Sequence, residues 1–552
     1  MPTEFELTAL SAAMAAAFLW ALPALKSRLE LSMAKHPSLT GHVRWAQRVT
    51  RQIPGYDYEE ETFFASDNAP EAVVARRKAA FRVLADTFAQ RFAKTNAVTA
   101  RARNALSDLQ FTAAYRVPFQ YGRYLRQHLG VGAFFNGSDG VLLEDLDGNR
   151  LFDLAGSYGV NLFGYDFYKS CIEEGNQRVA SLGPVLGGYH PVVLYNLQRL
   201  QEISGLDEVS FHMSGTEAVM QAVRLARYHT RRTHLVRFCG AYHGWWDDVQ
   251  PGPGNPMQAR QTYTLRDMHE RSLRVLQSRR DIACVLINPL QALHPNQPAP
   301  GDSALLDSSR NAHFDRTAYT AWLKDLRDVC TERGIVLIFD EVFLGFRLAP
   351  GGAQEYFGVR ADIVTYGKTL GGGLPVGVVC GRADLMKRFR PDRPADICFA
   401  RGTFNAHPYV MGAMQVFLQR LQSPQVLALY DGLDDRWNAR AARLNGLLRQ
   451  AGAPVRVANM SSVWTINYTQ PSRYNWMLQY YLRLHGLALS WVGSGRMIFS
   501  LNYSDGEFDA VAHRFVAAAG QMTTDGWWFH NPGQTNQTIR RRILREVLRH
   551  RF

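Results

Sequence analysis

The sequence predicts an α/β protein with a large domain on a mainly parallel β-sheet, a smaller α+β domain, and a helical extension at the N-terminus. Between about residues 190 and 400, short apolar runs such as Ile282–Ile287 and Ile335–Phe339 alternate with helical stretches, which is typical of βα units on a parallel sheet. Before residue 110, apolar side chains recur every three or four positions, which indicates helices; they include Phe81, Leu84, Phe88 and Phe92. After about residue 410 the pattern mixes helix and strand.

These patterns divide the chain into five parts. Near Val141 the helical pattern gives way to alternating residues around an Asp147-Gly148-Asn149 turn, which predicts a hairpin at the entrance to a new domain. We expect a helical N-terminal extension over 1–110, the N-terminal part of the small domain and its loops over 111–190, a large ligand-binding domain over 191–410, a C-terminal α+β part of the small domain over 411–525, and a basic amphipathic tail over 526–552.

The composition is that of a folded protein. Of the 552 residues, 46% are hydrophobic and 20% are charged, which argues against disorder. The net charge of +13 is concentrated at the end, where 539–552 contains six arginines and one glutamate, and no nucleic-acid-binding signature accompanies it. We therefore expect no nucleic-acid partner. The six cysteines are scattered without a CxxC pair or a metal-type Cys/His spacing, so we expect no metal site and a reducing, cytoplasmic setting.

Residues 7–25 form an uncharged, alanine-rich stretch close to the roughly 20 residues that a helix needs to span a bilayer. Glu4 and Glu6 precede it, unlike the basic start of a secretory signal, so we expect no export. Lys26 and Arg28 follow it, and if the stretch inserted, they would keep the rest of the chain on the cytoplasmic side. The expected location is cytoplasmic in either case, with membrane association through this segment as the alternative.

Both ends of the chain have a favoured interpretation as packed helices. At the N-terminus, Leu10, Met14 and Phe18 would form an apolar stripe that packs on the protein or on a partner. At the C-terminus, apolar residues recur from Ile539 to Val547 on one side of an arginine-rich helix. This tail either docks by its apolar side, which is favoured, or contacts an anionic membrane or a partner.

Two charged residues stand where a parallel sheet binds its ligands, at the carboxyl ends of strands. A buried strand over 334–339 ends at Asp340, and Lys368 follows in a glycine-rich turn over 367–373. These are the two protein groups that pyridoxal 5'-phosphate (PLP) requires, one to keep the pyridine nitrogen protonated and one to hold the aldehyde. Taken alone, Asp340 would be an ordinary helix cap and Lys368 an ordinary solvated turn residue.

A third element favours the functional interpretation. Ser214-Gly215-Thr216 follows a strand-like segment, 208–213, and opens a helix. Backbone N–H groups, two hydroxyls and the helix dipole then converge on one point, which makes an anion site suited to the cofactor phosphate. Capping of the helix is the structural alternative for Ser214.

These residues belong to longer motifs. They are Asp340-Glu341-Val342, Gly345-Phe346-Arg347, Gly352 to Gly358, Gly367-Lys368 and Gly371 to Gly377. The motifs closely resemble those of the class III (fold type I) aminotransferases, and within that family they are most similar to glutamate-1-semialdehyde 2,1-aminomutase. The resemblance covers about residues 115–510 and implies a fold type I PLP-transferase.

The resemblance implies that Lys368 carries PLP as a Schiff base and that Asp340 bonds the pyridine nitrogen. The residues that it implies for holding the phosphate or flanking the ring are Ser214, Gly215, Thr216, Tyr242, His243, Val342 and Thr403. Thr403 matches the threonine that reaches the phosphate of the neighbouring subunit, which implies a homodimer with shared active sites.

The substrate side is less well matched. Gly156-Ser157-Tyr158-Gly159 resembles the aminomutase's early substrate-side loop, so Ser157 and Tyr158 are candidate substrate residues, together with Arg496. The segment 491–502 around Arg496 departs from the aminomutase's C-terminal substrate loop. A second departure is Asn288-Pro289, where many relatives have Glu-Pro. Residues 245–256 stand where the aminomutase has a mobile gate, although Trp245 and Trp246 are equally suited to ordinary packing.

The expected activity is PLP-dependent transfer of an amino group to a specialised carbonyl substrate, through a Lys368 aldimine and pyridoxamine phosphate. Its partners would be a small-molecule amino donor and a carbonyl acceptor. One alternative is an intramolecular aminomutase, which would need no second substrate. The other is a non-catalytic scaffold that kept the fold.

Overall fold

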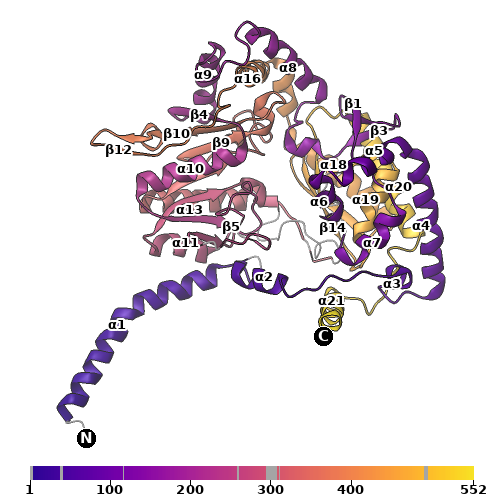
Figure 1. The fold of residues 1–552 in the computed structure, drawn as a ribbon, viewed down its shortest axis with the longest axis horizontal. Helices are drawn as coiled ribbons and strands as arrows, with labels where there is room; N and C mark the ends of the chain where they lie inside the picture. The colour runs from indigo at the N-terminus through magenta and orange to yellow at the C-terminus, as the bar shows by residue number, and fades with distance from the viewer. Residues whose placement is uncertain are drawn as a thin grey trace.

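A seven-stranded β-sheet forms the centre of the large domain in the computed structural model, which describes residues 4–37, 41–115, 117–250, 252–257, 260–293, 308–309, 311–489 and 495–552 (Figure 1). The strands are β4 (Glu208–His212), β5 (His234–Phe238), β6 (Thr262–Leu265), β7 (Ile282–Ile287), β8 (Val336–Asp340), β9 (Ile363–Gly367) and β10 (Gly377–Gly381). Their order is β4-β10-β9-β8-β7-β5-β6. Only β10 runs against its neighbours, β4 and β9, so the predicted mainly parallel sheet is confirmed.

Helices pack against this sheet because their apolar sides match its buried strands. The helices of this region are α8 (Tyr165–Val179), α9 (Val192–Ser204), α10 (Gly215–Thr230), α11 (Glu270–Ser278), α13 (Arg316–Arg333), α14 (Gly352–Phe357), α15 (Ala383–Met386) and α16 (Pro408–Arg420). In α10, Ala218, Ala222 and Ala226 recur every four residues and pack with Leu286 and Ile338 of the strands. A short hairpin, β11 (Phe389–Arg390) and β12 (Arg393–Ile397), extends from one edge.

Two small sheets form the core of the second domain. One contains β1 (Phe135–Asp139), β2 (Leu142–Asp145), β3 (Arg150–Asp153) and β15 (Leu487–Ala488); the other contains β13 (Val455–Met460), β14 (Val463–Tyr468) and β16 (Arg496–Ile498). The helices beside them are α17 (Pro424–Leu427), α18 (Leu433–Gln450), α19 (Leu478–Leu484) and α20 (Asp505–Thr524). The predicted hairpin near Val141 is present, as β2 and β3. Because β15 pairs with β3, segments more than 300 residues apart build one sheet.

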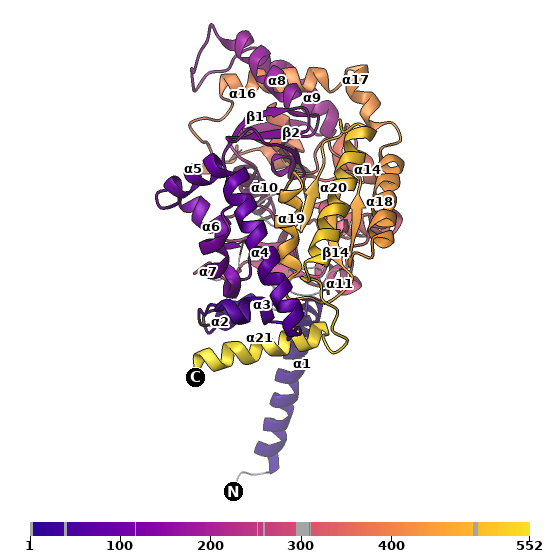
Figure 2. The same cartoon turned by 90° about the vertical axis from the view of Figure 1, so that its right-hand side faces the viewer.

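The described residues of the N-terminal region are mainly helical, as predicted for 1–110, and the helices continue to His128. They form α1 (Glu4–Ala34), α2 (Val43–Thr50), α3 (Glu60–Ala65), α4 (Glu71–Arg91), α5 (Ala93–Arg103), α6 (Ser107–Tyr115) and α7 (Phe119–His128). Helices α3 to α7 lie against the small domain (Figure 2). Their contact is aromatic, since Phe64 and Phe81 pack with Trp527, which follows α20.

The outer part of helix α1 does not pack on the protein, and its packing on a partner stays a prediction. The C-terminal end of α1 contacts α11, and the Arg266 N–H donates to the Ala34 carbonyl at 3.0 Å. The rest of the helix extends away from the body in both views (Figures 1 and 2), and the side chain of Met14 is 67% exposed. The side chains of Leu10 and Phe18 lie outside the described residues. In the part of the chain that the structure describes, we find no helix with the length and apolar character needed to cross a membrane.

Buried arginines lock both ends of the chain onto the small domain. Arg77 of α4 donates to both carboxylate oxygens of Asp67, at 2.8 and 2.6 Å, and to the Gly526 carbonyl at 2.8 Å. Arg473 bonds Glu546 of the C-terminal helix α21 (Asn536–Arg551), with Nη1 to Oε1 at 2.8 Å. The favoured interpretation of the tail holds, because Ile539 is buried and α21 packs by its apolar side.

Removing the acid in this lock should release the C-terminal helix. Glu546→Ala leaves the buried Arg473 guanidinium uncompensated, which costs about 3 kcal/mol. We expect faster hydrogen–deuterium exchange over 536–551 in this variant than in the parent protein. Glu332→Ala, at an exposed position of α13, is the matched control and should leave the exchange unchanged. Equal exchange rates in the two variants would contradict the role assigned to the lock.

Candidate active site

The register of the large sheet brings three strand ends to one place. Gly377 at the start of β10 pairs with His212 at the end of β4 on one side and with Gly367 at the end of β9 on the other. Asp340 at the end of β8 pairs with Thr365 of β9. Ser214, Lys368 and Asp340, far apart in sequence, therefore lie at the same edge of the sheet, where such folds bind their ligands.

Asp340 is buried, with 2% of its surface exposed, and its carboxylate accepts hydrogen bonds from His243, Val342 and, at 3.5 Å, the Thr365 hydroxyl. His243 Nδ1 lies 2.7 Å from Asp340 Oδ2, and the Val342 N–H lies 3.1 Å from Oδ1. Burial lowers the pKa of His243, although Asp340 opposes that shift. A neutral imidazole facing a carboxylate donates from Nδ1, which fixes the ring tautomer and the orientation of the acid. Among the described residues, His243 Nε2 has no hydrogen-bond partner.

Lys368 begins the turn after β9 with a φ of 48°, in the left-handed region that residues other than glycine rarely adopt. Burial lowers the pKa of its amine; the charge of Asp340 acts in the opposite direction and that of Arg347 in the same one. Its Nζ lies 5.9 Å from the centre of the Phe343 ring. The amine is thus more readily deprotonated than a solvated lysine while it stays close to a carboxylate.

The start of α10 forms an anion cradle beside these residues. The Ser214 side chain accepts a hydrogen bond from the Glu217 N–H at 3.2 Å and begins the helix, so the N–H groups of Gly215 and Thr216 are left for a ligand. Glycine is required around it, because a Cβ at Gly377 would lie 1.9 Å from the Ser214 carbonyl oxygen. Likewise, a Cβ at Gly215 would lie 2.5 Å from a methyl group of Val342.

These residues fit PLP. The buried carboxylate, the lysine with lowered pKa and the cradle match the ring nitrogen, the aldehyde and the phosphate of the cofactor, and Val342 lies between cradle and carboxylate. Tyr242 is exposed next to them, close enough for Asp340 to add to the rise in its pKa that burial causes. Thr403 lies apart, exposed in the loop between β12 and α16, and its contact with a neighbouring subunit stays a prediction.

The loop Gly156–Gly159 covers the lysine from the small-domain side. All four residues have positive φ, from 44° at Ser157 to 95° at Gly159. A Cβ at Gly159 would lie 2.6 Å from the Phe343 ring and 3.5 Å from Lys368 Cδ. This loop therefore packs directly against Lys368.

Hydrogen bonds hold this loop in its unusual conformation. The Ser157 hydroxyl lies 2.8 Å from the Tyr165 hydroxyl, which donates to Asp153 Oδ2 at 2.7 Å. Arg347 Nη2 donates to the Gly159 carbonyl at 3.2 Å. Asp153, Tyr165 and Arg347 were not assigned roles from the sequence; Arg347 stood in a quoted motif, but nothing local marked the other two.

Arg496 lies at the start of β16, next to the loop, since the Ile498 N–H bonds the Leu154 carbonyl at 2.9 Å. Burial lowers its pKa to about 10. Residues 491–494 of the predicted late substrate segment lie outside the described residues. Asn288 accepts a hydrogen bond from the Leu290 N–H at 3.0 Å and so caps the turn after β7.

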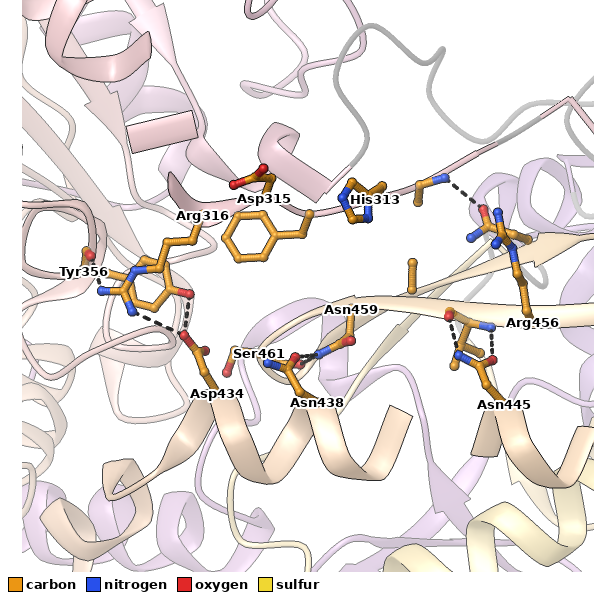
Figure 3. Close-up of a pocket in the computed structure, with 15 residues that line it drawn as sticks. His313, Asp315, Arg316, Tyr356, Asp434, Asn438, Asn445, Arg456, Asn459 and Ser461 are labelled. Carbon is orange, nitrogen blue, oxygen red and sulfur yellow. Dashed lines mark hydrogen bonds and ion pairs between the residues drawn. The ribbon is translucent and has the colours of Figure 1, made fainter. Parts of the chain in front are cut away.

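One cavity lies apart from these residues, and a second borders them. The larger cavity, about 640 Å³, lies between the loop before α13 on one side and helix α18 with strand β13 on the other (Figure 3). Most of its polar side chains are already hydrogen-bonded: Asn445 bonds the backbone of Val457, and Asp434 accepts from the Tyr356 hydroxyl. We therefore interpret this cavity as part of the contact between the two domains. The smaller, about 370 Å³, is lined by Ser157 and Tyr158. Residues of α6 also line it, so the N-terminal extension reaches this cavity.

Comparison with known proteins agrees with this arrangement. The family model for class III aminotransferases matches residues 125–518. The glutamate-1-semialdehyde 2,1-aminomutase of Methanothermobacter thermautotrophicus is 33% identical over 352 residues, which are 61% of this chain and 77% of the relative. The corresponding protein of Geotalea daltonii is 29% identical over 390 residues, 67% of this chain and 85% of the relative.

Solved structures give the same result. An omega-transaminase from Sphaerobacter thermophilus superposes with a TM-score of 0.62 and 26% identity over 78% of this chain and 97% of that one. A transaminase with PLP bound superposes with the same TM-score and identity, over 78% of this chain and 98% of that one. A glutamate-1-semialdehyde aminomutase from Pseudomonas aeruginosa, at 18% identity, has a TM-score of 0.65 over 81% of this chain and 99% of that one, a likeness of fold.

A methyl group on the covering loop should disturb the lysine. Gly159→Ala places a Cβ against Phe343, next to Lys368, so we expect PLP affinity to fall about tenfold or more, measured by titrating the apoprotein while following the visible absorption. Gly148→Ala is the matched control, because Gly148 also has positive φ but has open space around it. It should leave PLP affinity unchanged. Equal losses in both variants would mean that backbone strain, rather than contact with the site, is responsible.

Proposed function

Because this chain belongs to the class III aminotransferases and is a PLP-dependent enzyme, we propose that it transfers an amino group from a small-molecule donor to a specialised carbonyl substrate. The predicted family, fold type and cofactor are confirmed, and the alternative of a non-catalytic scaffold is not supported. The observation that carries the proposal is the meeting of Asp340, Lys368 and the Ser214 helix start at one edge of the sheet.

In this proposal each cofactor group has its own protein partner. Lys368 would hold the aldehyde carbon, and Asp340, oriented by His243, would keep the ring nitrogen protonated. The N–H groups and hydroxyls at 214–216 would hold the phosphate, because the positive end of α10 favours a dianion. Val342 and Tyr242 would contact the ring. When bound, PLP supplies an electron sink for the bonds at the substrate's amino-bearing carbon.

The protein then has to move one proton. Lys368 is suited to this step because burial lowers the pKa of its amine, which leaves more of it neutral and able to take a proton from the amino-bearing carbon of the substrate. Arg347 contributes to that shift and also bonds the Gly159 carbonyl, so the same guanidinium tunes the base and holds the loop that covers it.

The substrate side and the subunit arrangement are also proposals. Ser157, Tyr158 and Arg496 lie on neighbouring elements, and we assign them to substrate contact. A buried guanidinium such as that of Arg496 suits an anionic group of the substrate. We further assign Thr403 to the phosphate of the partner subunit in a homodimer with shared active sites, and we place the enzyme in the cytoplasm.

An intramolecular aminomutase is the second candidate. It is favoured by the relatives in the comparison, several of which are named glutamate-1-semialdehyde 2,1-aminomutase. Against it stands the departure of the sequence around Arg496 from the aminomutase pattern. The two candidates differ in their need for a second substrate.

A half-reaction experiment separates them. Purified holoenzyme is mixed with candidate amines, and the visible absorption of the bound cofactor is followed. An aminotransferase should bleach once, give one product per active site, and turn over only when a carbonyl acceptor is added. Sustained turnover of one compound without an acceptor would favour the aminomutase instead.

Lys368→Ala should abolish either activity. Without the amine that moves the proton, we expect turnover to fall by about 10⁴-fold or more, while PLP still binds through the cradle and Asp340. Lys387→Ala, at an exposed lysine, is the control and should retain full turnover. A Lys368→Ala enzyme with parental turnover would refute the assignment of the base.

Asp340→Asn should separate binding from catalysis. The amide keeps the size of the side chain but loses the charge that stabilises a protonated ring nitrogen, so we expect turnover to fall by about 10²- to 10³-fold with PLP still bound. Cofactor content and steady-state rates measure the two effects. Asp328→Asn, on the exposed side of α13, should change neither.

A further inference from the structure

The C-terminal helix α21 presents a basic and apolar surface to solvent. Its inner side packs on the protein, but Leu544, Leu548 and Phe552 are 58%, 46% and 95% exposed and recur one turn apart. Exposed arginines flank them at the same spacing, at 541, 545 and 549. An apolar stripe bordered by arginine is the pattern of helices that lie in the interface of a membrane.

The charge on this outer surface is of one sign because the acid of the helix is turned inward. Glu546, the only acidic residue of α21, faces Arg473 and Tyr58. The helix is also fixed in place, since His550 stacks on Tyr56 with 4.4 Å between ring centres. The arginines are therefore presented by a docked helix, so little order has to be gained on binding.

Helix α2 repeats the pattern beside it. Trp45 is 61% exposed, Val49 one turn further along α2 is exposed as well, and so is Ile53, which follows the helix. Arg48 lies over the Trp45 ring, 5.6 Å from its centre, and Arg44 is exposed too. The stacking of Tyr56 on His550 places the segment that follows α2 next to the end of α21.

Helix α1 extends beyond this surface. It leaves the body on the side where α2 and α21 lie (Figures 1 and 2). The exposed apolar side chains of its described part point in several directions around the helix: Leu19, Trp20, Leu22 and Leu25, with Trp20 86% exposed. Lys26 and Arg28 follow them towards the body.

We propose that α1, α2 and α21 bind the surface of an anionic lipid bilayer. The apolar part of α1 enters the lipid, Lys26 and Arg28 lie at the headgroups, and the arginines of α2 and α21 contact anionic headgroups with Trp45 and Leu544 between them. Tryptophan and basic residues are the side chains that favour this depth.

The observations favour lipid over a protein partner or a second copy of the chain. A protein partner covers one side of a helix, whereas the apolar residues of α1 surround it, which suits a solvent of lipid chains. The exposed arginines also favour a partner with a high density of negative charge. A second copy of this chain, with a net charge of +13, does not provide such a surface. α1, α2 and α21 lie outside residues 125–518, so the surface is separate from the unit shared with the family.

Vesicle flotation of the full-length holoenzyme tests the proposal. We expect binding to vesicles that contain phosphatidylserine, weak binding to phosphatidylcholine alone, and release by salt. Each basic residue near such a surface contributes about fivefold in affinity, so Arg541→Gln/Arg545→Gln should lower the affinity about 30-fold. The control, Arg101→Gln/Arg393→Gln, makes the same change in charge at exposed positions of α5 and β12 and should bind like the parent.

A second pair tests α1. Leu19→Asp/Leu22→Asp should weaken vesicle binding at least tenfold, whereas Leu29→Asp, on the body side of Lys26 and Arg28, should have a smaller effect. All variants should keep PLP binding. Failure of the parent to float, equal binding to both vesicle types, or self-association that Leu19→Asp/Leu22→Asp abolishes would overturn the proposal. Because the readout is flotation, its failure leaves the proposed amino transfer untouched.

Discussion

The close approach of two loops at Gly377 is the constraint on which the rest of the structure depends. Strand β10 is antiparallel to β4 and β9, so its first residue, Gly377, lies between the last residue of β4 and the last residue of β9. No side chain fits there, because even a Cβ would lie 1.9 Å from the Ser214 carbonyl oxygen. That contact sets the separation between the helix that forms the anion cradle and the turn that carries Lys368. A sheet with a side chain at this point would have to open, and the cradle would move away from the lysine.

Charge in the site is set by burial and by the partner of each group. Asp340 is buried yet held by His243 and a backbone N–H, which stabilise it as an acceptor. Lys368 is less exposed than a surface lysine and has the cation Arg347 nearby, and both effects lower its pKa. The site therefore places a held carboxylate and a readily deprotonated amine at one edge of the sheet. This difference in environment is what amino-group chemistry on a cationic ring requires of the protein.

The two ends of the chain are joined to this catalytic unit by buried cations rather than by apolar packing alone. Arg77 links α4 to Asp67 and Gly526, and Arg473 links Glu546 to the small domain. Breaking such a pair leaves an uncompensated charge in the protein interior, which is unfavourable. The ion pairs therefore oppose separation of the terminal helices from the small domain. One consequence is that α21 keeps its acid inside and its arginines outside. Residues of α6 line the cavity beside Ser157.

The sequence by itself determined the sheet, the family with its cofactor and the helical nature of the extension, because these depend on local signals. Buried strands appear in the sequence as short runs of apolar residues. Asp340, Lys368 and Ser214 each stand at or just after the end of such a strand, in a recognisable motif. It could not determine the Asp153–Tyr165–Ser157 chain, the contact of Arg347 with Gly159, or the pairing of Arg473 with Glu546, since each joins ordinary residues through tertiary packing. The same holds for α1: an alanine-rich helix can pack or stand free, and only the fold shows that Met14 is exposed. The spacing of apolar residues shows which side of a helix is apolar. It does not show what packs against that side, because the partner lies elsewhere in the chain and is brought there by the tertiary fold.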